Sequence, residues 1–311
     1  MNIKITKNIK EANLVTHTGS FHPDDVFSTA FLSKMVENPV LIRTANPSEA
    51  IEGAIVYDIG FGKFDHHGTD ARYRTTPYDK IKYCSFGLLW EEFGLNYLKN
   101  LFNENINHEQ LYKNIEEKLI LQIDAIDNGY FPKVESEYPL TDLDKVIDLF
   151  NKTWIEEVDN DDNFLIAVNI ASQILDRVIK REYGLIIASK KLEPLFDTVE
   201  NNILFLEEYI PYNDAIFNST HEKASSIKIV IFPSNRGGYN VKPMTINKKS
   251  KELVVNFPKE LWGLHDEELA QASKIKGARF IHLTGFMAAT EDKESAYELA
   301  SLALNNQEEI N

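Results

Sequence analysis

Three consecutive polar residues, Asp65-His66-His67, constrain this chain more than any other feature of its sequence. They come soon after a short apolar segment, residues 54–57, which ends in Asp58. Aspartate is rarely buried without a partner and histidine is buried only moderately often, so packing does not explain the triplet. An acid at the end of an apolar segment, followed by an acid and two imidazoles, indicates a chemical site beside a buried strand.

A second polar cluster lies near the start of the chain, in residues 16–25, and also follows a short apolar run. It contains His17, His22 and Asp24, and four of the eight histidines of the protein fall in these two segments. A third acidic segment ends a helical pattern, and within it Asp127, beside an Asn-Gly turn, is a better candidate ligand than Asp124. Imidazole and carboxylate together suit Mn, Zn or Fe better than Ca, so we predict one metal site built from separate loops.

The first half of the chain alternates short apolar runs with helical patterns. Residues 14–16, 40–43 and 54–57 predict buried strands, and residues 24–36 have apolar positions at helical spacing. This alternation predicts an α/β domain with a mainly parallel sheet flanked by helices. Ligands of such sheets bind beyond the carboxyl ends of the strands, and both polar clusters directly follow predicted strands.

The remainder of the chain predicts a second, smaller domain. Helical patterns cover residues 111–127 and 164–195, strands are expected at 227–232, 239–246, 253–257 and 279–283, and a helix at 291–304. We therefore predict a catalytic domain over residues 1–195, a junction over 196–226, and an α+β domain over 227–311.

Composition limits the function classes. The chain of 311 residues has a net charge of -15, which disfavours broad nonspecific nucleic-acid binding but leaves a nucleotide substrate open. With one cysteine, Cys84, no apolar signal core and no apolar stretch of membrane length, the expectation is a soluble cytoplasmic protein. The sequence has no nucleophile elbow and no phosphate loop, whereas three histidines and three aspartates could hold two ions with Asp58 bridging them.

The order of these motifs resembles the DHH phosphoesterase superfamily. More narrowly, residues 16–25, 57–60, 65–67 and 124–129 look like the MYG family (melanocyte proliferating gene one), described as metal-dependent hydrolases or RNA exonucleases. Two further segments, residues 261–269 and 280–286, match the same family pattern. The resemblance covers nearly the whole chain, and its separated motifs occur in the family's order.

The resemblance implies a role for each candidate residue. The implied metal ligands are His17, His22, Asp24, Asp58, His66 and Asp127. His67 would contact the scissile phosphate, and Asp65 would orient an imidazole, so that Asp58, Asp65 and His67 form the catalytic set. Arg236 and His282 of the second domain would hold the substrate across a cleft. Two divalent ions are expected, Mn²⁺ first, with Mg²⁺ or Zn²⁺ as alternatives.

Three functions remain open at this point. The first is a 3′–5′ exonuclease acting on RNA or short oligonucleotides through a metal-activated water. The second is a hydrolase of a small phosphate compound, such as pyrophosphate or a cyclic or short nucleotide, which the acidic composition favours. The third is a metal-binding regulatory protein without catalysis, which would need a closed site, because catalytic sites keep one position for water. No membrane partner is expected, and oligomerisation is left open.

Overall fold

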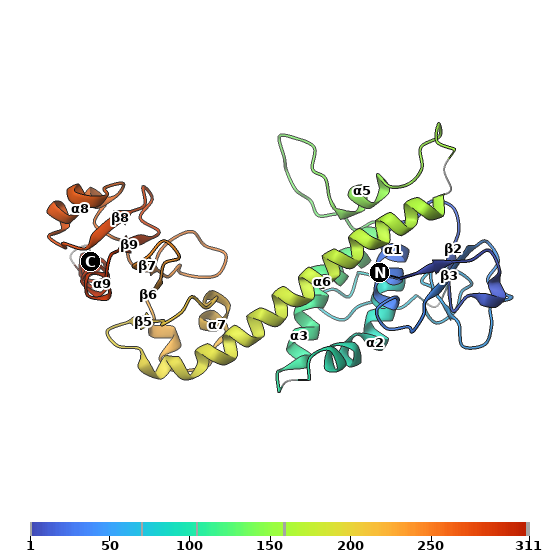
Figure 1. The fold of residues 1–311 in the computed structure, drawn as a ribbon, viewed down its shortest axis with the longest axis horizontal. Helices are drawn as coiled ribbons and strands as arrows, with labels where there is room; N and C mark the ends of the chain where they lie inside the picture. The colour runs from blue at the N-terminus through green and yellow to red at the C-terminus, as the bar shows by residue number, and fades with distance from the viewer. Residues whose placement is uncertain (1, 70, 104, 158–159, 309–311) are drawn as a thin grey trace. The chain divides into compact units, whose positions relative to one another are not determined.

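A computed structural model describes residues 2–69, 71–103, 105–157 and 160–308. The chain forms two compact units, Met1–Tyr183 and Gly184–Asn311, each of which has its own sheet (Figure 1). The division lies inside one long helix, α6 (Asn160–Leu192), so part of that helix belongs to each unit. No helix among the described residues is both long and apolar enough to cross a membrane.

The first unit contains a four-stranded, fully parallel sheet in the order β1-β3-β2-β4. Its strands are β1 (Lys4–Ile5), β2 (Leu14–His17), β3 (Val40–Thr44) and β4 (Ile55–Val56). Leu14 pairs with Leu41 on one side and with Ile55 on the other. The predicted α/β class with a parallel sheet is therefore confirmed, and the three predicted strands of this domain are present.

Helices pack beside this sheet and on one another, with α1 (Pro23–Leu32) in contact with β2. The others are α2 (Ser85–Leu101), α3 (His108–Ile115), the π-helical turn η2 (Glu116–Ile120), α4 (Leu121–Asp127) and α5 (Leu143–Asp148). Every residue of α1 is buried, because the helix packs against α2 and α4 as well as the sheet (Figure 1). Phe31 of α1 makes ring contacts with Phe86 and Trp90 of α2, which forms the centre of this core.

The helix α2 was not predicted from the sequence. It contains Gly87 and Gly94, and glycine lowers helix propensity by about 1 kcal/mol relative to alanine. Gly87 allows a close approach between α2 and α4, because a Cβ there would meet the Asp124 carboxylate, and Gly94 leaves room for the Trp90 ring of the same helix. Tertiary packing therefore overrides local propensity in this helix.

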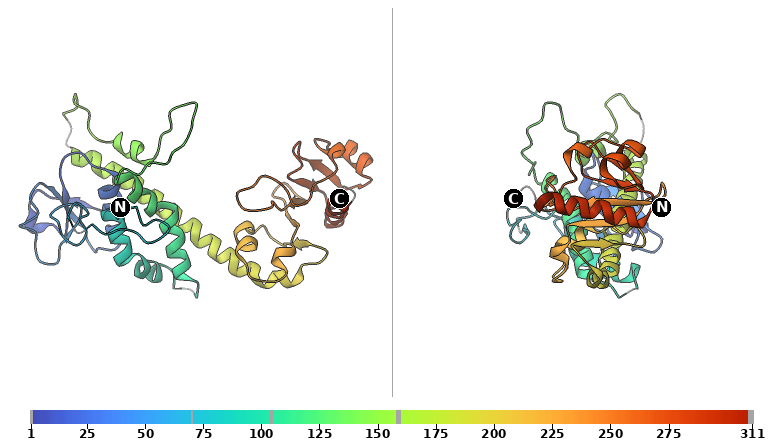
Figure 2. Two further views of the ribbon diagram at one scale, coloured as in Figure 1. Left: turned by 180° about the vertical axis from the view of Figure 1, so that it is seen from behind. Right: turned by 90° about the vertical axis from the view of Figure 1, so that its left-hand side faces the viewer.

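The second unit contains a mixed five-stranded sheet in the order β5-β6-β7-β9-β8. Its strands are β5 (Ile203–Phe205), β6 (Ile229–Pro233), β7 (Tyr239–Pro243), β8 (Ala278–Ile281) and β9 (Ala288–Thr290). The helices are α7 (Asn213–Asn218), α8 (Asp266–Ser273) and α9 (Lys293–Glu308), with 3₁₀ turns η3 (Glu193–Thr198), η4 (Ala224–Ser226) and η5 (Lys259–Leu261). Figure 2 shows α9 lying across this sheet, against which it packs.

The structure divides the domains differently from the prediction. Residues 196–226, expected to be a junction, belong to the second unit, because β5 pairs in parallel with β6, Ile203 opposite Ile229. The apolar side chains of this segment share a core with Leu192 at the end of α6. The predicted strand at 253–257 is absent and only Leu253 forms a bridge, while α1 ends at Leu32, earlier than the predicted Val36.

Candidate metal centre

The centre forms where β2 and β4 end. His17 is the last residue of β2, and Asp58 follows β4 by two residues. The backbone of Asp58 has φ +55, a left-handed conformation that is uncommon for a residue with a side chain, and Gly60 follows with φ +88. This turn brings the chain back, so that the Asp58 amide donates to the Phe64 carbonyl at 3.0 Å. Residues 65–67 are thereby placed beside the strand ends.

The amino end of α1 supplies two fully buried acids, Asp24 and Asp25. Pro23 opens the helix, and the His22 amide donates to Asp25 Oδ1 at 2.8 Å. The partial positive charge at a helix amino end favours carboxylates there. Asp25 Oδ2 is free of that bond and lies 3.2 Å from His17 Nε2.

Asp58 lies between two histidines, with one carboxylate oxygen facing each. Its Oδ2 is 3.3 Å from His17 Nε2, and its Oδ1 is 3.3 Å from His66 Nε2. His66 Nε2 also lies 3.3 Å from Asp127 Oδ2 and 3.4 Å from Asp24 Oδ2. Three overlapping groups have the geometry of metal ligands: His17, Asp25 and Asp58; Asp24, His66 and Asp127; and Asp58, His66 and His67.

Buried polar atoms without hydrogen bonds test whether a cation fits. Asp24 Oδ1 and Asp127 Oδ2 are buried and accept no hydrogen bond from the described residues, while Asp25 Oδ2 is buried and faces His17 Nε2 at 3.2 Å. A buried carboxylate oxygen without a donor is costly unless positive charge lies nearby. A divalent ion would supply that charge, and the mixed nitrogen and oxygen donors suit Mn²⁺ or Zn²⁺. The residues present therefore fit the metal that the sequence implied.

The pKa shifts of the centre also indicate an excess of negative charge among its buried side chains. Burial raises the pKa of Asp24 well above its usual value, and the neighbouring carboxylates of Asp58 and Asp127 raise it further. Burial opposes the charged form of His17, but hydrogen bonds to Asp25 and Asp58 raise its pKa to about 10. Without a metal, the centre therefore holds protons that a cation would displace.

The amino end of α2 supports the acids from behind. The Ser85 amide donates to Asp24 Oδ2 at 3.1 Å, and Ser85 Oγ donates to Asp58 Oδ1 at 3.2 Å. The Cys84 amide donates to Asp124 Oδ1 at 3.0 Å. The unpaired amides at the start of a helix need such acceptors, so Asp24 and Asp124 cap α2, and the Ser85 hydroxyl fixes Asp58.

Asp124 is a supporting residue, as the sequence indicated. It is fully buried, and Arg74 Nε donates to its Oδ2 at 2.5 Å. Arg74 also donates to Glu116 Oε1 at 2.9 Å. Sequence reasoning missed Arg74, because nothing in its local pattern distinguishes it from a surface arginine.

Asp65 holds the outer histidine. Its Oδ1 accepts from the His67 amide at 3.0 Å and lies 2.8 Å from His67 Nδ1, while its Oδ2 accepts from the Phe61 amide at 2.7 Å. Burial opposes the charged form of Asp65, but the backbone amides of His67 and Phe61 lower its pKa. His67 is 57% exposed, and its Nδ1 lies 3.6 Å from Asp58 Oδ1. The imidazole is therefore fixed at the solvent side of the centre.

Five of the six residues predicted as ligands lie within the three groups, and one does not. The five are His17, Asp24, Asp58, His66 and Asp127. His22 is exposed as the N-cap of α1, its ring centroid 6.0 Å from that of His17, and it belongs to none of the groups found among the described residues. Asp25 lies in one of these groups, with His17 and Asp58. The pair of adjacent aspartates was the sequence signal for it.

Arg236 and His282 both lie in the second unit. Arg236 is exposed in the turn between β6 and β7, and His282 follows β8, where its Nδ1 accepts from the Thr284 amide at 3.2 Å. The register places the Arg236 turn beside Ala278 at the start of β8, so the two residues lie at opposite ends of that strand. The structure does not bring them together, and their contact with a substrate stays a prediction.

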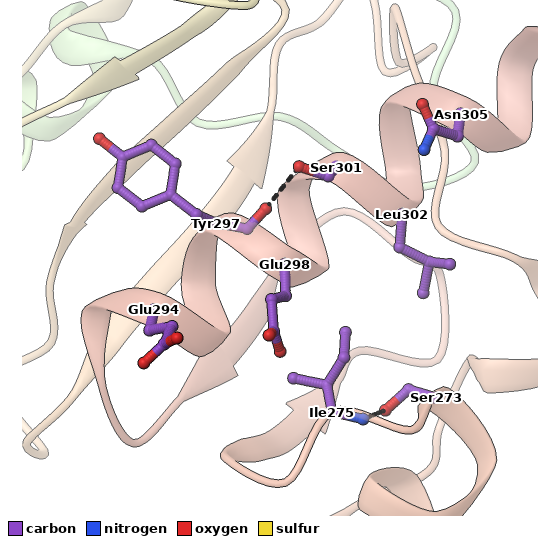
Figure 3. Close-up of a pocket in the computed structure, with 8 residues that line it drawn as sticks. All are labelled: Ser273, Ile275, Glu294, Tyr297, Glu298, Ser301, Leu302 and Asn305. Carbon is purple, nitrogen blue, oxygen red and sulfur yellow. Dashed lines mark hydrogen bonds between the residues drawn. The ribbon is translucent and has the colours of Figure 1, made fainter.

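The second unit has a surface pocket of about 670 Å³ between α9 and the segment after α8 (Figure 3). Its lining residues are Ser273, Ile275, Glu294, Tyr297, Glu298, Ser301, Leu302 and Asn305. Two carboxylates beside apolar side chains suit no phosphate group, since like charges repel. In the described structure, neither of the two predicted substrate residues lines it.

Comparison with known proteins gives full-length relatives. The yeast Saccharomyces cerevisiae MYG1 protein YER156C is 27% identical, over 98% of this chain and 97% of its own. The Dictyostelium discoideum MYG1 protein is 28% identical over 96% and 98%, and the human MYG1 exonuclease is 24% identical over 93% and 85%. A solved structure, the pGpG-specific phosphodiesterase PggH from Vibrio, gives 12% identity and a TM-score of 0.30 over 96% of this chain and 98% of its own, too low to show a shared fold.

A family model named MYG1_exonuc and described as uncharacterised protein family UPF0160 matches residues 13–304. The match begins in front of β2 and ends within α9, and so includes every residue of the metal centre. It confirms the narrower of the two resemblances stated from the sequence motifs, to the MYG family. The chain therefore belongs to the family of the MYG1_exonuc model, UPF0160.

Proposed function

We propose that this protein is a metal-dependent phosphodiester hydrolase that acts as a 3′–5′ exonuclease on RNA or short oligonucleotides. The observation that carries the proposal is the position of Asp58, whose two carboxylate oxygens face His17 and His66 in two different ligand groups. A carboxylate in that position suits a bridge between two ions. The rat, mouse and human relatives named MYG1 exonuclease support the reaction class.

Two ligand sets follow from the geometry. His17, Asp25 and Asp58 would hold one ion, and Asp24, Asp58, His66 and Asp127 would hold the other. Bound as a pair, divalent ions lower the pKa of water and stabilise charge on the attacking and leaving oxygens of phosphoryl transfer. Mn²⁺ is the proposed metal, because the donors combine imidazole and carboxylate.

The chain's own residues bind and orient the substrate. Because Asp65 accepts at His67 Nδ1, the other ring nitrogen faces the exposed side of the centre, where it would donate to a phosphate oxygen when the ring carries both protons. Neither neighbouring nucleophile is suited to attack. Burial raises the pKa of the Cys84 thiol well above its usual value, and Ser85 Oγ is bonded to Asp58. Water is therefore the proposed nucleophile.

The deciding experiment replaces the bridging carboxylate. In Mn²⁺, Asp58→Ala is expected to lower hydrolysis of a labelled oligoribonucleotide by more than about 100-fold, since both ligand sets lose a member. His108→Ala is the matched control, because His108 lies on α3 with its Nε2 bonded to the Phe102 carbonyl, outside the centre. Equal losses in two folded variants would show that the active centre lies elsewhere.

A second candidate is hydrolysis of a small phosphate compound such as pyrophosphate or a cyclic or short nucleotide. The net charge of -15 favours it, since long polyanions are repelled by an acidic surface. Initial rates on pyrophosphate, a cyclic dinucleotide and a trinucleotide under one set of metal conditions separate the two candidates. A non-catalytic metal site is disfavoured by the exposed His67, which leaves one side of the centre open.

A further inference from the structure

Phe61 places an aromatic ring in solvent, in the turn that leads from Asp58 to Asp65 of the metal centre. Its side chain is 76% exposed, in a turn between Gly60 and Gly62 that joins Asp58 to Asp65. Its backbone has φ +55, a conformation that glycine adopts freely and a phenylalanine does not. Neither burial nor backbone preference accounts for a phenylalanine at this position, so its ring contributes little to the fold.

The position of this residue is tied to His67. The Phe61 amide donates to Asp65 Oδ2 at 2.7 Å, and the other oxygen of the same carboxylate lies 2.8 Å from His67 Nδ1. One carboxylate therefore fixes both the turn that carries the ring and the imidazole proposed to contact the phosphate. The turn that carries the ring is therefore held beside the imidazole proposed to contact the phosphate.

We infer that Phe61 is a stacking surface for the nucleobase attached to the scissile phosphate, an inference that rests on the proposed function. Bases stack on exposed aromatic side chains largely without regard to sequence, because every base has a π-face. Because the chain has a net charge of -15, its long-range attraction for substrate phosphates is weak. Stacking of the base on Phe61 would add to the affinity for a nucleotide without depending on charge. Pyrophosphate has no base, and Phe61 would therefore select nucleotides over inorganic phosphates.

The test compares AMP with inorganic phosphate as ligands of the full-length protein in Mn²⁺, measured by calorimetry. The wild type is expected to bind AMP about 10-fold more tightly than phosphate, a difference that base stacking accounts for. In Phe61→Gly this preference disappears while phosphate affinity is unchanged. Glycine suits the positive φ, so the variant keeps its thermal midpoint, which loss of a structural side chain would lower.

Two further variants sharpen the result. Phe61→Trp keeps an aromatic face and is expected to retain the AMP preference. Leu101→Ala removes an exposed apolar side chain from the far end of α2, 16 residues from Ser85, and leaves the preference intact.

A wild type without AMP preference, or a Phe61→Gly variant that keeps it, overturns the inference and leaves the proposed hydrolysis standing. The proposed function is tested separately, by measuring turnover in Asp58→Ala. Its failure can therefore be distinguished from failure of the Phe61 inference. Calorimetry with AMP tests Phe61 without any turnover.

Discussion

Asp65 Oδ1 lies 2.8 Å from His67 Nδ1, and the same oxygen accepts a hydrogen bond from the His67 amide. The carboxylate therefore fixes both the backbone and the ring of the imidazole. We expect Asp65→Asn to lower kcat by about 10- to 100-fold with a smaller change in KM, as loss of an orienting carboxylate does at metal sites. Steady-state kinetics with parallel metal analysis measures this. Asp79→Asn, an exposed acid in the same loop, should be silent, and a matching loss there would refute the orienting role.

Gly87 determines how closely α2 approaches Asp124. A Cβ at this position would lie 2.8 Å from Asp124 Cγ, and that side chain cannot move aside because Arg74 and the Cys84 amide hold it. Gly87→Ala is therefore expected to destabilise the protein by about 1–3 kcal/mol. Gly184→Ala is the control, since no atom lies within 4 Å of its added Cβ in α6, and it should stabilise by about 0.5–1 kcal/mol. Urea unfolding that ranks the two variants the other way contradicts this account.

The metal-free protein should become less stable at alkaline pH, because His17 loses its proton there. Hydrogen bonds to Asp25 and Asp58 outweigh burial and raise its pKa from 6.5 to about 10. A folded-state pKa above the unfolded one means that the folded chain binds more protons between these values. The contribution is fully present below pH 6.5 and is lost as pH rises through about 10. Urea midpoints measured in chelator should fall more steeply from pH 7 to 10 in the wild type than in His17→Gln, and parallel curves would exclude this linkage.

Arg236 is predicted to bind substrate phosphate from the second unit. Its guanidinium can form two hydrogen bonds with a phosphate, binding that ground and transition states share. Arg236→Ala should therefore raise KM for an oligonucleotide several-fold with little change in kcat. Lys249→Ala removes the same charge from another exposed turn of that unit and controls for net charge. An unchanged KM, or an equal rise in both variants, would remove Arg236 from the substrate site.

The parallel sheet and most of the centre could be predicted because their signals are local. Buried parallel strands appear as short apolar runs, and residues that follow such strands meet at one edge of the sheet. His17 and Asp58 follow this rule directly. The acids of α1 follow it too, since a proline and two aspartates mark a helix start. The chemistry predicted for these residues came from the resemblance to a known family, not from the spacing of the residues in the sequence.

The parts that escaped prediction depend on distant residues. The position of Asp25 follows from the cap of α1, in which one Asp25 oxygen accepts from the His22 amide and the other lies beside His17, at the end of β2. The pairing of Arg74 with Asp124 joins residues 50 positions apart. The strand β5 has three residues, and only its pairing with β6 distinguishes it from a loop.

The bond from Ser85 to Asp24 has an evolutionary consequence. Because Asp24 accepts from the Ser85 amide at the start of α2 and Asp58 accepts from the Ser85 hydroxyl, replacing either by a small apolar residue would leave a Ser85 donor without its acceptor and remove an acid from the centre. Asparagine keeps an oxygen acceptor for Ser85 while losing the negative charge. A lineage that abandoned the chemistry would therefore drift first to asparagine at these positions. Relatives carrying Asn there would be stable, folded descendants that no longer hold the metal.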